Sequence, residues 1–174
     1  MVNPVKNRNQ TGTIAFGGMI AALYVVLTYL ANAMGLASGA VQVRFSEALT
    51  ILPVLTSAAI PGLTVGCLLA NLLTGCALLD VVFGTVATLI GAVGTRMLRK
   101  TPALAWIPPV VSNTVIVPVI LMRVYHVPEA WGILALQILA GEMISCCVLG
   151  LALYYASHRS LRPVLEKTFG LSTN

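Results

Sequence analysis

Residues 13–34 read TIAFGGMIAALYVVLTYLANAM, a run of 22 residues without a single charged side chain. A helix of about 20 apolar residues crosses the roughly 30 Å hydrocarbon core of a bilayer, so this run predicts a transmembrane helix. It is longer than the apolar core of a removable signal peptide, which has about 7–15 residues. We therefore expect it to remain in the protein as the first span.

The rest of the chain has the same character, because 58% of its 174 residues are hydrophobic and 9% are charged. Soluble domains are about half apolar and about a quarter charged, which excludes a soluble single domain. The length allows about six spans and leaves no room for a water-soluble catalytic domain. Strands of a membrane barrel alternate apolar and polar residues, whereas runs such as 110–122 do not. The sequence predicts an all-α integral membrane protein, folded as a compact helix bundle.

Local signals divide the apolar sequence into six spans. A stretch rich in Gly, Ser and Ala at 35–40 predicts a loop, and Ser46 followed by Glu47 predicts a helix start with an acid in its first turn. Pro61 and Gly62 predict a break between two short helices. We expect one six-helix domain over residues 1–174, with spans at about 13–34, 46–60, 62–75, 78–98, 103–123 and 129–157.

Basic residues decide between six spans and an alternative in which 47–75 form one kinked element and the chain crosses five times. Cytoplasmic loops of membrane proteins carry an excess of Lys and Arg. Six spans with an internal N-terminus place two basic residues, Arg44 and Arg123, outside, whereas five spans largely remove the asymmetry. We therefore expect six spans and both termini in the cytoplasm. The basic residues then inside are Lys6, Arg8, Arg96, Arg99, Lys100, Arg159, Arg162 and Lys167.

Polar residues in and beside the spans are candidates for a binding site. Ionisable groups at such depths cost several kcal/mol unless they are paired or line a wet cavity. Structural roles stay open: an interfacial ion pair, a helix-dipole partner, or hydrogen bonds between helices. Gly141 allows close backbone approach beside the deepest acid. Four candidates converge on the outer ends of helices and two lie deeper: Arg44, Glu47, Asn71 and Asp80, then Asn113 and Glu142.

Small residues on the first span form two overlapping pairs at helical spacing, Gly17 with Ala21 and Gly18 with Ala22. Such spacing lets another helix approach closely, either within the chain or from a partner. The absence of other motifs excludes several functions. No phosphate-binding loop, hydrolase motif or His and Cys cluster occurs, and no basic run is interleaved with aromatics. We expect no catalytic residue, no metal site, no ATP hydrolysis by this chain and no nucleic-acid partner.

Several segments together resemble the QueT family. They are VQVRFSEAL at 41–49, AIPGL at 59–63, ANLL at 70–73, LDVVFGTVATL at 79–89, the two prolines 108–109 followed by Asn113, and GEMI at 141–144. The resemblance implies a substrate-binding S component of an energy-coupling factor (ECF) transporter in the bacterial cytoplasmic membrane. Its partners would be a transmembrane scaffold subunit and two cytoplasmic ATPases, and its ligand a queuosine precursor. Small residues of the first helix would dock on the scaffold, which here points to Gly17, Gly18, Ala21 and Ala22.

The candidate residues suit such a ligand. A 7-deazaguanine presents two adjacent N–H donors, which a carboxylate accepts bidentately, and a carbonyl acceptor. Glu47, Asp80 or Glu142 could supply the carboxylate, an asparagine could contact the remaining edge, and Arg44 could donate to the carbonyl. Phe45 or Phe83 could cover the ring. Two rivals stay open: an S component for another vitamin such as thiamine, and a small stand-alone carrier, although no inverted repeat supports the carrier.

Overall fold

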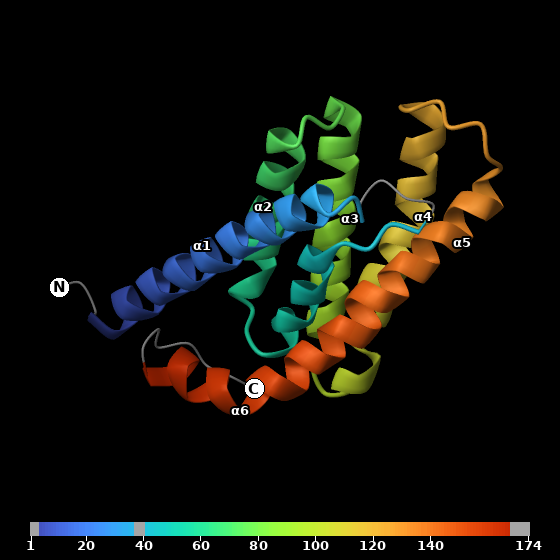
Figure 1. Ribbon diagram of the computed structural model, residues 1–174. Coiled ribbons are helices and arrows are strands. Elements are labelled where there is room, and N and C mark those ends of the chain that lie inside the picture. Colours follow the sequence, from blue (N-terminus) through green and yellow to red (C-terminus); the bar gives the residue numbers. More distant parts are fainter. Residues whose placement is uncertain (1–3, 37–40, 168–174) are drawn as a thin grey trace.

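The computed structural model describes residues 4–36 and 41–167, and this part of the chain consists of helices and their connections, with no strand (Figure 1). The side chains of 4–9, Arg159 and Arg162 lie outside the described part, as does most of the loop expected at 35–40. The elements in chain order are α1 (Pro4–Ala33), η1 (Phe45–Val54), α2 (Ala59–Leu73), α3 (Leu78–Met97), η2 (Pro102–Leu104), α4 (Ile107–Arg123), α5 (Trp131–Glu142), η3 (Met143–Leu149) and α6 (Gly150–Lys167).

Four helical segments are long and apolar enough to cross a membrane: Gln10–Ala33, Leu78–Met97, Pro102–Arg123 and Trp131–His158. Large apolar side chains point outward along them, as with Met97 (76% exposed) and Leu136 (67% exposed). An outer surface of this kind fits lipid, so the expected helical membrane protein is confirmed. The two remaining apolar helices, η1 and α2, are shorter than a full span.

The short helix η1 lies in the middle of the bundle, and every residue from Ser46 to Val54 is buried. It packs against α1, α3, α6 and η3. Its ten residues form a 3-10 helix, which is long for that geometry. Arg96 of α3 donates from Nη1 to the carbonyls of Pro53 and Val54, at 3.1 and 3.3 Å, and so satisfies the far end of η1. The helix η1 is thus packed on several sides and hydrogen-bonded at its far end.

The break expected at Pro61 and Gly62 is wrong. The chain turns at 55–58 instead, and α2 begins at Ala59 with Pro61 in its first turn. Proline is tolerated there because the first N–H groups of a helix have no partner within it. The helix expected from 103 likewise starts later, at Ile107, with prolines in its first turn.

The last helix is longer than the expected 129–157, because α5, η3 and α6 run on without interruption from Trp131 to Lys167. The middle part, η3, has π-helical geometry. Leu165 near the C-terminal end is fully buried and joins the core cluster that contains Phe16 of α1. The part of the helix beyond 157 therefore packs into the core through Leu165.

Candidate solute-binding site

A cavity of about 750 Å³ lies where α1, α2 and α4 end and α3 begins. In Figure 1 the connections 74–77 and 124–130 lie at this end, at the top of the view, and the turns at 55–58 and 98–106 lie at the bottom. We call it the main cavity. Pockets of about 300–1,000 Å³ hold small-molecule ligands. Its lining residues are Tyr24, Thr28, Tyr29, Ala31, Asn32, Gln42, Arg44, Ser46, Asn71, Leu73, Thr74, Cys76, Asp80, Leu121, Tyr125 and Val127.

Three of the predicted residues, Arg44, Asn71 and Asp80, line the main cavity together. The Arg44 guanidinium has no hydrogen-bond partner in the described part of the chain, although it lies within electrostatic range of Asp80. Gly84 of α3 leaves room for the side chains of Asn71 and Asp80. A Cβ at Gly84 would lie 3.1 Å from Asn71 Nδ2 and 3.5 Å from Asp80 Oδ1. The sequence thus identified a set of polar groups that share one cavity.

Tyr125, in the connection after α4, fixes the orientation of Asp80. Its hydroxyl donates to Asp80 Oδ2 at 2.8 Å and accepts from the Ala77 N–H at 3.1 Å. Partial burial, together with the nearby carboxylate, raises the pKa of Tyr125 to about 12. The phenol therefore keeps its proton near neutral pH and remains a donor to Asp80.

Behind the cavity wall, Glu47 forms a second group with two further predicted residues and one cysteine. We call Glu47, Asn113, Glu142 and Cys146 the buried acid cluster. Asn113 Nδ2 donates to Glu142 Oε1 at 3.0 Å, and Cys146 Sγ donates to Glu142 Oε2 at 3.1 Å. Glu47 is 1% exposed and Glu142 5% exposed. The cluster is therefore closed to solvent in this structure.

Tyr24 joins the buried acid cluster to the main cavity. It lines the cavity, and its hydroxyl donates to Glu47 Oε1 at 2.5 Å. The other oxygen, Oε2, is buried and has no partner among the described residues. A buried acceptor without a donor costs free energy, so a donor that reached Oε2 would be bound favourably.

Two backbone features place these side chains. A Cβ on Gly141 would collide with the Gln42 carbonyl oxygen, so the glycine lets the 41–44 segment lie directly on α5, as expected from the sequence. The Arg44 N–H then donates to Ser145 Oγ at 3.1 Å. Ser145 belongs to π-helical η3, a geometry that is frequent at functional sites.

Glu47, Glu142 and Cys146 also present ligand atoms within 4.8 Å of one another. Two carboxylates and a thiol of this spacing could hold a metal ion, and they come from η1, α5 and η3. The same carboxylates are equally suited to accept N–H donors from an organic ligand. The spacing of the cysteines along the sequence gave no indication of this group.

Tyrosines, rather than phenylalanines, supply the aromatic lining. Phe83 is 49% exposed and lines a separate apolar groove between α3 and α4, so its suggested place over the ligand is wrong. Phe45 is half-buried and does not line the main cavity. Sequence reasoning did not identify Tyr24, Tyr29 or Tyr125 as part of the site. The available signal was the cluster of polar and tyrosine residues at 24–32 in an otherwise apolar span.

The four predicted docking residues separate into two pairs. Gly17 and Ala21 are buried against α2, where a Cβ on Gly62 would lie 2.6 Å from the Gly17 carbonyl oxygen. Gly18 and Ala22 are exposed. A groove of about 230 Å³ runs between α1 and α2, and its lining includes Gly17, Gly18 and Ala21. Small residues thus serve close packing inside the chain and also leave a shallow external groove.

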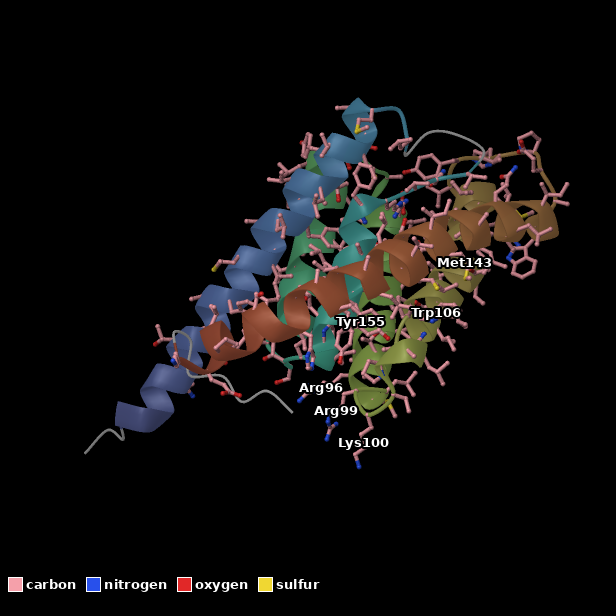
Figure 2. All side chains as sticks on the ribbon, turned by 60° about the horizontal axis from the view of Figure 1, so that its bottom comes forward. Arg96, Arg99, Lys100, Trp106, Met143 and Tyr155 are labelled. Atoms are coloured by element: carbon pink, nitrogen blue, oxygen red, sulfur yellow. The ribbon has the colours of Figure 1, made fainter. Side chains whose placement is uncertain are left out.

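Basic residues gather at the end of the bundle that lies away from the main cavity. Figure 2 shows Arg96, Arg99 and Lys100 together beside the α3–α4 connection. The cavity lining, in contrast, contains one cation, Arg44, and one acid, Asp80. The two ends of the bundle therefore differ in charge, as the sequence predicts.

An apolar helix bundle with a solute-sized cavity at one end is typical of solute-binding membrane proteins. A family model described as QueT transporter matches residues 14–159, so the chain belongs to the QueT transporter family. It is accordingly an S component of an ECF transporter, with a queuosine precursor as its solute. No curated protein and no solved structure matches the chain.

Proposed function

We propose that the chain crosses the bacterial cytoplasmic membrane with six helical segments, with both termini inside and the main cavity open to the outside. The support is the position of Arg96, Arg99 and Lys100 at the end away from the cavity, because basic residues favour the cytoplasmic side. Single cysteines at 99 and at 129 test this orientation. We expect an impermeant maleimide to label 129 and not 99 in intact cells, and the reverse pattern would overturn it.

The cavity then captures a 7-deazaguanine from outside without ATP. The observation that carries this proposal is the buried Glu47 with its unpartnered Oε2, which lies next to a residue of the Arg44-lined cavity, because Tyr24 lines that cavity and donates to Glu47 Oε1. On binding, the base displaces that hydroxyl and donates its adjacent N–H groups to Glu47. Arg44 donates to the ligand carbonyl.

The other predicted residues complete the pocket. Glu142 stays bound to Asn113 and holds that amide near the base, while Asn71 contacts the opposite edge. This arrangement matches each hydrogen-bonding group of a guanine-like base with a polar side chain of the pocket.

Energy for uptake comes from partner subunits. We propose that a transmembrane scaffold subunit docks on the groove between α1 and α2, and that two cytoplasmic ATPases bound to the scaffold hydrolyse ATP. Gly18→Leu adds bulk at an open position, because nothing lies within 4 Å of a Cβ there. We expect uptake to be abolished and ligand binding by the purified subunit to persist. Met19→Leu, at an exposed neighbour, is the matched control.

Calorimetry on the purified subunit tests the ligand. We expect 7-aminomethyl-7-deazaguanine (preQ1) and queuine to bind without ATP, and thiamine not to bind. Glu129→Gln is a suitable control variant, because Glu129 is exposed and does not line the cavity. Preferential binding of thiamine, or no binding of any deazaguanine, would overturn the proposed function.

A further inference from the structure

We propose that the main cavity selects precursors whose substituent at position 7 carries a positive charge, and that Asp80 is the residue that pairs with this charge. The inference rests on the proposed function, in which Glu47 and Arg44 hold the base. It assigns the remaining space of the cavity to the substituent.

The volume of the cavity is the first argument. About 750 Å³ lies near the upper end of the range for small-molecule pockets, and a bicyclic base fills only part of it. The base occupies the side next to Tyr24 and Glu47, which leaves the side formed by the start of α3 and the connection after α4. Asp80 and Tyr125 lie there.

The balance of charge is the second argument. Asp80 is the one carboxylate and Arg44 the one cation among the lining residues. Glu47 and Glu142 lie directly behind the wall, within electrostatic range of Arg44. Arg44 therefore keeps acidic neighbours even when a positive group of the ligand pairs with Asp80.

The tyrosines are the third argument. The hydroxyls of Tyr29 and Tyr125 are both engaged, with the Leu73 carbonyl at 2.8 Å and with Asp80. What these side chains still offer a ligand is the aromatic ring. Rings of tyrosine attract ammonium groups, and several of them around one space are typical of sites for amines.

Asp80 itself is prepared for such a partner. Tyr125 holds Oδ2, whereas Oδ1 accepts no hydrogen bond in the part of the chain that the structure describes. An ammonium group that donates to Oδ1 would give the second carboxylate oxygen a hydrogen-bond donor without breaking the contact with Tyr125. This geometry gives Asp80 a role in specificity that differs from the role of Glu47.

Two ligands with the same base separate these roles: preQ1, which carries an aminomethyl group, and preQ0, which carries an uncharged nitrile. We expect the parent protein to bind preQ1 about tenfold to hundredfold more tightly than preQ0, the range for one charged hydrogen bond. Acetylation of the preQ1 amine removes the charge and should abolish this preference. Calorimetry at low and moderate salt gives the affinities.

Variants then locate the effect. Asp80→Asn should remove most of the preference for preQ1, and Tyr125→Phe should reduce it in part, with preQ0 binding little changed. Glu47→Gln should lower the affinity for both ligands by the same factor and leave the ratio of the two affinities unchanged. Glu129→Gln should change neither affinity. Equal affinities of the parent for preQ1 and preQ0, or an unchanged ratio in Asp80→Asn, would overturn this inference while the proposed function stands. Failure of both ligands to bind the parent would overturn the proposed function.

Discussion

The main cavity and the buried acid cluster both contain carboxylates, but those of the cavity can reach water and those of the cluster are closed to solvent. Asp80 lines the cavity and is oriented by a tyrosine hydroxyl, with one oxygen still free. Glu47 is 1% exposed and has one oxygen without any donor among the described residues. A free oxygen facing a cavity can be served by water, whereas a free oxygen in the interior carries an unpaid desolvation penalty. From this difference we expect Glu47 to contribute more to affinity and Asp80 more to selectivity.

The strongest test of this comparison is Glu47→Gln, which keeps the shape and replaces an acceptor oxygen by a donor. We expect preQ1 affinity to fall about a hundredfold or more, since two N–H donors of the base would face an amide instead of a carboxylate. The unfolding temperature of the free protein should stay equal or rise, because a buried acid is removed. Calorimetry and thermal unfolding in detergent measure the two effects. A variant that binds like the parent would show that Glu47 does not contact the ligand.

Gly141→Ala tests whether the 41–44 segment must lie on α5 to complete the cavity. The new Cβ would collide with the Gln42 carbonyl oxygen and push Arg44 away from Ser145. Overpacking of this kind costs about 1–3 kcal/mol, so we expect about a tenfold or larger loss of affinity. Gly132→Ala in the same helix is the control, because a Cβ there meets nothing within 4 Å. Equal affinities of the two variants would show that the segment adapts freely.

Tyr24→Phe removes the hydroxyl between the two regions and should have the smallest effect on binding. Glu47 Oε1 loses its donor, so the free protein should be less stable by about 1–3 kcal/mol. Affinity should change less than about tenfold and in the direction of tighter binding, because the ligand no longer displaces that hydroxyl. Tyr29→Phe, which loses an exposed hydrogen bond, is the matched control for the thermal measurement. A stability loss no greater than that of Tyr29→Phe would contradict the role given to Tyr24.

The sequence predicted the helical membrane fold and several members of both polar groups, because apolar runs and intramembrane charges follow directly from the cost of burying polar groups in lipid. It also predicted the close approach at Gly141. It misplaced the break near Pro61, since proline fits the first turn of a helix as well as it ends one. Whether η1 adopts 3-10 geometry depends on neighbours such as Arg96 that are distant in sequence.

The separation of the polar residues into a cavity and a closed cluster could not be predicted either. Arg44 and Glu47 are only three positions apart in the chain, yet Arg44 lines the cavity and Glu47 lies behind its wall. Which side of the wall each occupies is set by the packing of η1 in the bundle. Tyr24 was missed because a tyrosine in an apolar span is usually a packing residue.

The π-helical segment η3 sets how far the side chains of α6 are rotated about the helix axis relative to those of α5. Before it, Leu134 and Ile138 of α5 are buried, and after it Leu165 of α6 closes the core beside α1. Each residue of a regular helix turns the chain by about 100°, so deleting one residue from η3 would turn α6 by that angle while leaving α5 in place. Leu165 would then leave the core although its own sequence neighbours were intact. The length of η3, to the single residue, therefore determines which face of the C-terminal helix meets the N-terminal one.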